Sequence, residues 1–421
     1  MEPHLSTRRI SSAALYLTVF VPFALGHYVS FLFRSINAVL SPFLVESLQL
    51  NAAQLGLLSS AYFVAFGLAQ LPVGIALDRF GPRRVQPVLL GVAAAGSLMF
   101  AFSSSFGALF VARALTGLGL AACFMGAIKA LSSWVPPQKR PSVNGYLLAV
   151  GGLGAMSATL PAQIALELFS WRGLFAGLAV LTLAPALLIH FATPPEPPAQ
   201  GVPRRITAAS LLEVYRDRQF LRTAALLLPS HAVAFGLQGL WMGQWMQDVA
   251  GLDARAVANY LFWGMGAIIV GSLTVGHVAE WAQRRHGMKP LDVAGIGVAL
   301  FVCVQLLACL NIVALIPALT IAFTLVGTIA GLDYTIVSQS VPASMTGRAA
   351  TSLNVLIFMG AFVVQGGFGL VVGAWGADIA NHYPPVAYQA AFGAAVLIQL
   401  PGLIGWLLGR RGRAGQERMQ P

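Results

Sequence analysis

The stretch Gly74-Ile-Ala-Leu-Asp78-Arg79-Phe-Gly81-Pro-Arg83-Arg84 gathers one acidic and three basic residues between two long apolar segments. Basic residues that collect where an apolar segment ends mark the side on which a chain leaves a membrane. The glycines allow the backbone to turn tightly and to approach its neighbours closely. The stretch therefore predicts a membrane protein and the side on which this loop lies.

The composition is that of a polytopic membrane protein. Of the 421 residues, 57% are hydrophobic and 9% are charged, and the mean hydropathy is +0.76; a soluble domain carries about 25% charged residues. Runs of about 20 apolar residues, the length that crosses about 30 Å of hydrocarbon, recur along the chain. We expect an all-α integral membrane protein with twelve transmembrane helices, at residues 14–40, 53–77, 85–104, 106–130, 142–166, 171–191, 220–246, 256–279, 291–311, 315–340, 350–375 and 386–408.

The basic residues sort by side of the membrane. Most of the 25 Lys and Arg residues fall on one predicted face, and only Arg172 and Arg255 fall on the other. Because positive residues mark the cytoplasmic side, we expect both termini to be cytoplasmic and the protein to lie in the plasma (inner) membrane. The net charge of +11 then reflects topology, and nucleic-acid binding is not expected.

No pattern in the sequence predicts catalysis. Cys123, Cys303 and Cys309 fall inside apolar spans without metal-ligand spacing. Neither a phosphate-cradling loop nor a Ser-His-Asp arrangement is evident, so we expect no enzyme activity, no metal and no cofactor. The first apolar run is too long for a signal peptide and is expected to remain as the first helix.

One long polar segment divides the spans into two sets of six. It combines a proline-rich linker with Leu211, Leu212 and Tyr215 at helical spacing, which predicts a short amphipathic helix on the membrane surface. The expected domains are an N-terminal six-helix bundle at 1–191, a cytoplasmic linker at 192–219, a C-terminal six-helix bundle at 220–409 and a basic cytoplasmic tail at 410–421.

The two sets of six echo each other in sequence. Gly276-His-Val-Ala-Glu280 repeats the pattern of Gly74-Ile-Ala-Leu-Asp78 and is again followed by basic residues. A second echo, at a separation of about 204 residues, is typical of pseudo-symmetric transporter halves. It pairs His27, Arg34 and Ser41 with His231, Gln238 and Trp245.

The loop Gly74-x-x-x-Asp78-Arg79-x-Gly81-x-Arg83-Arg84 resembles the signature loop of the major facilitator superfamily, and Arg113-Ala-Leu-Thr-Gly117-Leu-Gly119 resembles a second motif of that family. The resemblance covers essentially the whole chain. It implies a secondary transporter that works by alternating access, with spans one, four, seven and ten around a central pathway. Drug antiporters of the family carry Gly-Pro in span five; this chain has Ala158-Thr159, with Pro161 slightly displaced, which counts against that class.

The signature loop is interpreted as a conformational latch. Asp78 is predicted to lie against the free N–H groups at the start of span eleven, near 344–351, where the helix dipole favours negative charge. The arginines would then brace the ends of neighbouring helices. The alternative is an orientation signal made only of basic residues. The predicted latch comprises Gly74, Asp78, Arg79, Gly81, Arg83 and Arg84.

Charged and polar residues inside the spans predict the substrate site. A charge in hydrocarbon costs at least about 3 kcal/mol, so it needs a partner or a water-filled cavity. Arg34 and Arg113 lie at similar predicted depths, with no carboxylate at that depth in the first half, which favours a small organic anion. For Arg113 a structural role stays open. The candidate substrate-binding residues are Arg34, Arg113, His27, Asn37, His231, Gln238 and Trp241.

Energy coupling is predicted less sharply. Because no ATP-binding loop is evident, transport is expected to use a gradient or to run passively. Proton coupling would use His27, His231 or Asp333, and Asp333 is also expected to form a structural ion pair with Lys129. The expected partners are a small anion, the lipid bilayer and protons, with the monomer as the working unit. An exporter of drugs or other solutes and a ligand sensor without flux stay open.

Overall fold

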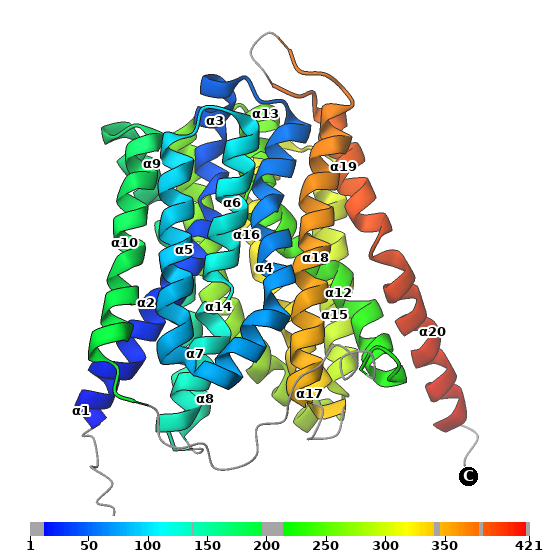
Figure 1. Cartoon of the computed structure of the whole chain (residues 1–421). Coiled ribbons are helices and arrows are strands. Elements are labelled where there is room, and N and C mark those ends of the chain that lie inside the picture. Colours follow the sequence, from blue (N-terminus) through cyan, green and yellow to red (C-terminus); the bar gives the residue numbers. More distant parts are fainter. Residues whose placement is uncertain (1–11, 137–138, 196–213, 341–345, 379–381, 418–421) are drawn as a thin grey trace, which may run out of the picture.

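The computed structural model describes residues 12–136, 139–195, 214–340, 346–378 and 382–417. Residues 196–213, which include Leu211 and Leu212 of the predicted amphipathic helix, lie outside the described residues. Within the described residues, twelve helices are long and apolar enough to cross a membrane, which agrees with the predicted number (Figure 1). They are Tyr16–Ser35, Ala52–Phe80, Pro82–Phe102, Phe106–Trp134, Ser142–Leu168, Trp171–Ala192, Arg218–Gln238, Ala254–His286, Pro290–Cys309, Val313–Val337, Ala349–Gly373 and Pro385–Arg410.

The first six spans form the N-terminal half. Polar residues cap several of its helices: Asn51 accepts a bond from the Gln54 N–H at the start of α4, and Ser105 and Ser170 do the same for α6 and α10. The elements are α1 (Ser12–Leu15), the π-helical turn η1 (Tyr16–Phe20), α2 (Val21–Ser35), α3 (Asn37–Leu48), α4 (Ala52–Phe80), α5 (Pro82–Phe102), α6 (Phe106–Leu120), α7 (Cys123–Trp134), α8 (Arg140–Ser157), α9 (Leu160–Leu168) and α10 (Trp171–Ala192).

The last six spans form the C-terminal half. Asp217 and Asp253 cap its first and third helices. The elements are α12 (Arg218–Gln238), α13 (Trp241–Ala250), α14 (Ala254–His286), α15 (Pro290–Cys309), η3 (Val313–Leu315), α16 (Ile316–Gly327), η4 (Thr328–Gly331), α17 (Leu332–Ser340), α18 (Thr346–Gly373), α19 (Pro385–Leu397) and α20 (Leu400–Glu417).

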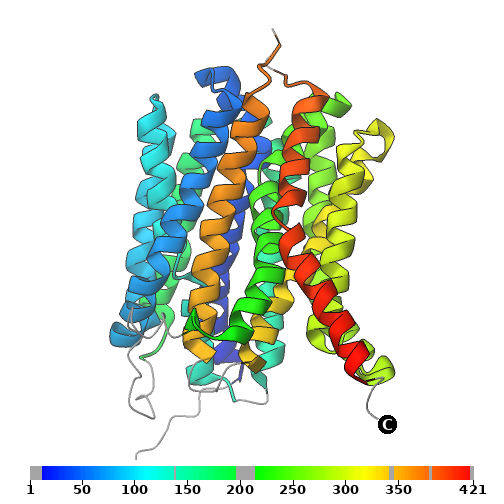
Figure 2. The same ribbon diagram turned by 90° about the vertical axis from the view of Figure 1, so that its right-hand side faces the viewer.

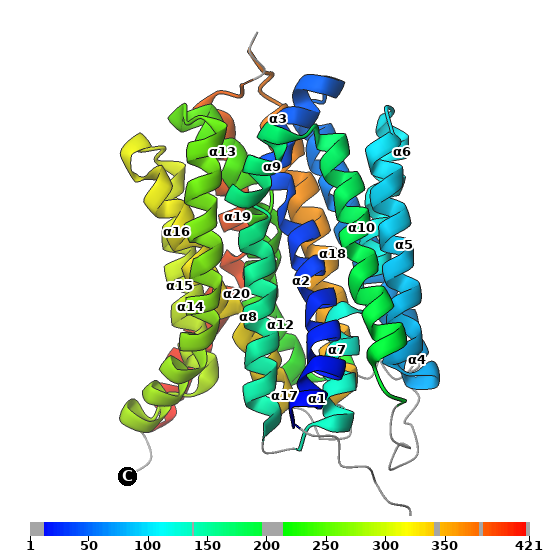
Figure 3. The same ribbon diagram turned by 90° about the vertical axis from the view of Figure 1, so that its left-hand side faces the viewer.

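The two halves lie side by side and meet along two pairs of helices. Helices α4 and α18 pack together on one side, and α8 and α14 pack together on the other (Figures 1 and 3). We call the end of the bundle that carries α1 and the C-terminal end of α20 the terminal face, and the opposite end the far face (Figure 2).

Among the described residues, six of the twelve spans predicted from the sequence are interrupted, including the four that the family resemblance places around the pathway. The chain bends between α2 and α3 at Ile36, between α6 and α7, between α12 and α13, and through the 3-10 turn η4. Span five breaks at Ala158–Thr159, ahead of Pro161, whose ring cannot continue the hydrogen-bond ladder. Breaks at membrane depth are typical of transporter binding regions.

The halves cross tightly near the far face. Gly243 at the start of α13 lies against Ala38 of α3, and a Cβ atom at Gly243 would lie 2.6 Å from the Ala38 carbonyl oxygen. A Cβ at Gly239 would lie 2.9 Å from the Arg34 carbonyl oxygen. Glycine is required at these positions because a larger residue would push the two backbones apart. The backbones of spans one and seven are therefore in direct contact near the far face.

A polar bridge joins the halves nearer the terminal face. Asn354 of α18 donates a hydrogen bond of 2.7 Å to the Gln70 side-chain oxygen of α4, and it accepts one of 2.6 Å from the Tyr334 hydroxyl. Gln70 and Asn354 are buried. A hydrogen bond between buried amides contributes more to stability than an exposed one. A buried amide that loses its partner has no water to replace it.

We expect Asn354→Leu to lower the midpoint of thermal unfolding, because it leaves the Gln70 oxygen and the Tyr334 hydroxyl unpaired, at a cost of about 1–3 kcal/mol. Gln70→Leu alone should also destabilise. The double variant should lose less than the sum of the two, with a coupling of about 1 kcal/mol, as measured in a double-mutant cycle on the purified protein. Strictly additive losses would mean that this bond contributes nothing to holding the halves together.

Candidate functional site

Arg34 lies in the last turn of α2, and its side chain is only partly buried. Its Cζ atom is 3.7 Å from the centroid of the Phe31 ring and 4.5 Å from that of Phe235, which belongs to the other half. Within the described residues, no carboxylate pairs with the guanidinium and no acceptor bonds it. The N–H groups along the edge of the guanidinium are therefore available to a ligand.

His231 and Asp333 form a buried pair beside this position. The His231 Nδ1 atom lies 2.7 Å from the Asp333 Oδ2 atom, and both side chains are almost fully buried. The His231 ring also packs against the Phe235 ring, with 4.5 Å between centroids. The predicted pairing of Asp333 with Lys129 is wrong, because Asp333 faces α12 within its own half and Lys129 is engaged elsewhere.

His27 is buried on the same face of α2 as Arg34, one to two turns away. Its ring packs against Phe31 and Phe124, at centroid distances of 4.8 and 5.2 Å. Neither ring nitrogen has a hydrogen-bond partner among the described residues. Buried polar atoms without partners usually meet water or a ligand, so His27 remains a candidate contact.

Arg113 is enclosed more completely than the sequence predicts for a substrate contact. Its side chain is 1% exposed, and its Nε and Nη1 atoms have no partner among the described residues. Its Cζ atom lies 6.0 Å from the Tyr62 ring centroid and 5.8 Å from that of Phe100, on α4 and α5. The enclosure within the N-terminal half favours the structural role over direct contact with a substrate.

The other three predicted contacts lie toward the far face. Asn37 begins α3 and is buried. Gln238 ends α12, and its amide lies 3.4 Å from the Met265 sulfur. Trp241 is fully buried: a Cβ at Gly56 or Gly369 would lie within 3.0 Å of its ring. The Trp241 ring is therefore a wedge between α4 and α18.

The signature loop joins α4 to α5 on the terminal face. The Asp78 carboxylate pairs with the Lys129 ammonium of α7 at 2.6 Å, and Lys129 also donates to the Leu77 carbonyl at 2.7 Å. Residues 341–345 lie outside the described residues, so the predicted contact of Asp78 with the start of span eleven stays a prediction. The observed partner is in the same half.

The remaining loop residues have distinct surroundings. Gly81 has a φ of +77°, which confirms the tight turn predicted there. The Arg83 guanidinium donates to the His190 carbonyl at the end of α10, at 3.4 Å. Arg79 packs over Phe80, and Arg84 is exposed. Close approach at Gly74 is not observed, because a Cβ there would meet open space.

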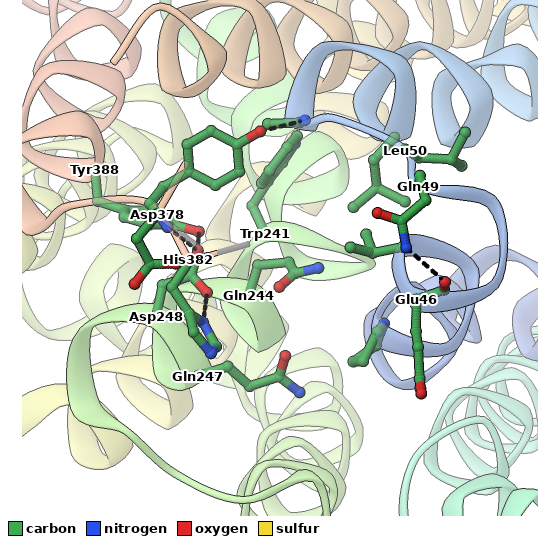
Figure 4. A pocket seen from close by; sticks show the side chains of 15 residues that line it. Glu46, Gln49, Leu50, Trp241, Gln244, Gln247, Asp248, Asp378, His382 and Tyr388 are labelled. Atoms are coloured by element: carbon green, nitrogen blue, oxygen red, sulfur yellow. Dashed lines mark hydrogen bonds and ion pairs between the residues drawn. The ribbon is translucent and has the colours of Figure 1, made fainter. Parts of the chain in front are cut away.

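An outer pocket of about 600 Å³ opens above the crossing of the two halves (Figure 4). On one wall Asp248 accepts hydrogen bonds from His382, Tyr388 and the Tyr383 N–H, at 2.7, 2.6 and 3.3 Å. Burial raises the pKa of the Asp248 carboxyl, and these hydrogen bonds partly offset the shift. The Tyr383 hydroxyl in turn accepts the Ala52 N–H at the start of α4, which ties the halves together.

The residues that surround Arg34 from the other helices were not predicted from the sequence. Phe235 and Tyr334 come from the C-terminal half, and Tyr62 comes from α4. Gln70 of α4 is linked to Tyr334 through Asn354. Gln70 carried a signal, since it is a polar residue inside an apolar span. The aromatic residues carried none, because phenyl rings are common in any membrane helix.

Comparisons with known proteins identify the family to which the chain belongs. The Major Facilitator Superfamily model matches residues 23–365. The hexuronate transporter of Escherichia coli (strain K12) is 26% identical over 410 residues, which cover 91% of this chain and 92% of that protein. The cis,cis-muconate transport protein of Acinetobacter baylyi is 26% identical over 329 residues, or 75% of this chain and 76% of that protein.

A solved structure has a similar fold. The bacterial homolog to the human lysosomal transporter Spinster, in an inward-facing and unoccupied conformation, matches with a TM-score of 0.75 at 16% identity and covers 95% of this chain and 98% of its own. Twelve spans, interrupted pathway helices and a family model that covers most of the chain lead to one conclusion. The chain is a multi-pass membrane protein that belongs to the Major Facilitator Superfamily.

Proposed function

We propose that this protein is a gradient-driven transporter that moves a small organic anion by alternating access. The observation that carries the proposal is the Arg34 guanidinium, which lies inside the bundle between rings of both halves without a carboxylate partner among the described residues. An uncompensated charge at this depth is costly and marks a site for an oppositely charged ligand. A carboxylate can meet a guanidinium with two parallel hydrogen bonds.

The relatives support an anionic substrate. The hexuronate and cis,cis-muconate transporters named above handle carboxylates, at identities of 26%. Identity at this level does not carry a particular substrate over to this chain, so the proposal is limited to the class of small organic anions. His27 and His231 are proposed as the neutral contacts of the site.

Proton coupling is proposed at the His231–Asp333 pair. The two side chains share a short hydrogen bond in a buried position, and the Phe235 ring that packs on His231 also contacts Arg34. A histidine and a carboxylate are both groups that can carry a proton. A proton bound here would offset the negative charge that the anion brings into the membrane.

The membrane placement is proposed from the distribution of charge. The terminal face carries Arg79, Arg83 and Arg84, so it is assigned to the cytoplasm, with both chain ends on that side. The membrane is the plasma (inner) membrane, and the monomer is the working unit. The domains are the two bundles at 1–191 and 220–409 with the linker 192–219 between them.

The signature loop is proposed to act as the conformational latch. The Asp78–Lys129 pair links α4 to α7 on the terminal face, next to the turn at Gly81. Both side chains are partly exposed, so the pair contributes little to stability and can exchange partners when the halves move. The pair would therefore act on the rate of transport more than on folding.

Arg34→Gln should abolish transport without unfolding the protein. Loss of a bidentate, charge-assisted contact should weaken binding of small carboxylates by at least about 30-fold. Flux into proteoliposomes and thermal shift with a panel that includes hexuronate and cis,cis-muconate measure the two effects, with the exposed Arg255→Gln as control. Unimpaired flux in Arg34→Gln, with competition by lipophilic cations, would favour a drug exporter, and binding without flux would favour a sensor.

Asp333→Asn should separate exchange from accumulation. Because the amide cannot take up a proton, uptake driven by a pH gradient should be lost, whereas exchange of anion for anion should continue. Both modes are measured in the same proteoliposomes, with and without an imposed gradient. Retention of gradient-driven accumulation by this variant and by His231→Gln would rule the pair out as the coupling site.

Asp78→Asn should slow transport several-fold while leaving the amount of protein in the membrane and its unfolding temperature nearly unchanged, since exposed pairs are worth about 0–1 kcal/mol. The control is Glu167→Gln, an exposed carboxylate on the far face. Initial rates of uptake by Asp78→Asn equal to those of the control would reduce the loop to an orientation signal.

A further inference from the structure

The Arg34 guanidinium is held between aromatic rings from both halves. Phe31 lies one turn before it on α2, and Phe235 approaches from α12, at 3.7 and 4.5 Å from Cζ to the ring centroids. Both rings are only partly buried. Because the rings cover the faces of the guanidinium, a ligand reaches the charge at the edge that carries the N–H groups. A ligand bound at that edge lies beside the rings.

The aromatic surface continues across the boundary between the halves. Phe358 of α18 lies 5.9 Å from Phe235 and 4.1 Å from Phe66, measured between centroids. Phe66 in turn stacks on Tyr62 of α4 at 5.8 Å. Phe358, Phe66 and Tyr62 are themselves buried. Together with Phe31 and Phe235 they form an aromatic surface from four helices, α2, α12, α18 and α4, and such a surface favours planar, unsaturated groups.

The polar side chains nearby are largely engaged with one another. The Tyr62 hydroxyl donates to the Ser30 carbonyl at 3.3 Å, the Tyr334 hydroxyl donates to Asn354, and His231 is paired with Asp333. A ligand rich in hydroxyls would have to displace these bonds or leave its own hydroxyls unpaired, and either outcome lowers affinity. His27, whose two ring nitrogens have no partner among the described residues, offers a neutral contact without such a displacement.

We infer that the anion recognised at Arg34 has a planar unsaturated or aromatic body, and that polyhydroxylated sugar acids are disfavoured. The inference rests on the proposed function, since it takes Arg34 as the anion contact. Phe235 is the specificity-determining residue: it touches the guanidinium from the half opposite to Arg34, so it forms part of the surface against which the ligand body lies.

The test compares carboxylic acids on the full-length protein in nanodiscs, by calorimetric titration. The monoanions benzoate, cyclohexanecarboxylate and glucuronate carry equal charge, and the dianion cis,cis-muconate is a fourth probe. We expect benzoate to bind at least about tenfold more tightly than glucuronate, and more tightly than cyclohexanecarboxylate, which is apolar but not planar.

Phe235→Leu keeps an apolar side chain and removes the ring. It should weaken the preferred unsaturated ligand by about three- to tenfold and glucuronate by less, so that the ratio of the two affinities falls. Phe191→Leu, at a ring that is 75% exposed on the outside of the bundle, is the matched control. The ligand ranking on the unmodified protein decides the question even where Phe235→Leu proves unstable.

Glucuronate binding that equals or exceeds that of the unsaturated acids, and that is lost in Arg34→Gln, would overturn this inference and leave the proposed function standing. Failure of all four acids to bind, or binding that survives Arg34→Gln, would overturn the proposed function itself and the inference with it.

Discussion

Inside a bilayer the backbone has no water to bond with, and this constraint governs the structure. Each span satisfies its N–H and C=O groups as a helix, so an interruption at membrane depth is tolerated only where protein or a watery space surrounds it. The breaks at Ile36, at Gly239 and at the turn Thr328–Gly331 lie in spans one, seven and ten. These three breaks thus lie where the family resemblance places the pathway.

A charge is costly inside the bilayer, so the charged side chains there differ in whether they have a partner. Asp333 has His231 as its partner, and Asp78 has Lys129 at the membrane edge. Arg113 is enclosed by rings without an acceptor among the described residues. Arg34 alone among these four charged residues combines partial exposure with the lack of a charged partner, which makes it the position where a bound anion would lower the energy most.

Hydropathy was enough to predict the spans, and a glycine was enough to predict the turn at position 81, because these are properties of the order of residues along one chain. Pairing was not predictable in the same way. Depth alone paired Asp333 with Lys129, whereas each has a partner closer in its own half. Depth fixes one coordinate of a side chain; its direction around the helix axis and the packing of neighbouring helices fix the others. Trp241 shows the same limit, since only the packing of Gly56 and Gly369 makes it a wedge.

The polar chain near the centre links the proposed proton site to the boundary between the halves. Asp333 bonds His231 through one carboxylate oxygen and the Tyr334 N–H through the other, and the Tyr334 hydroxyl continues to Asn354 and then to Gln70 of the opposite half. A change of charge at Asp333 therefore affects Tyr334, whose hydroxyl bonds to Asn354 in the bridge between the halves. Rocking of the halves requires that such cross-boundary bonds exchange partners. In the proposed mechanism, binding of a proton and of an anion beside this chain thus alters the same contacts that alternating access must break.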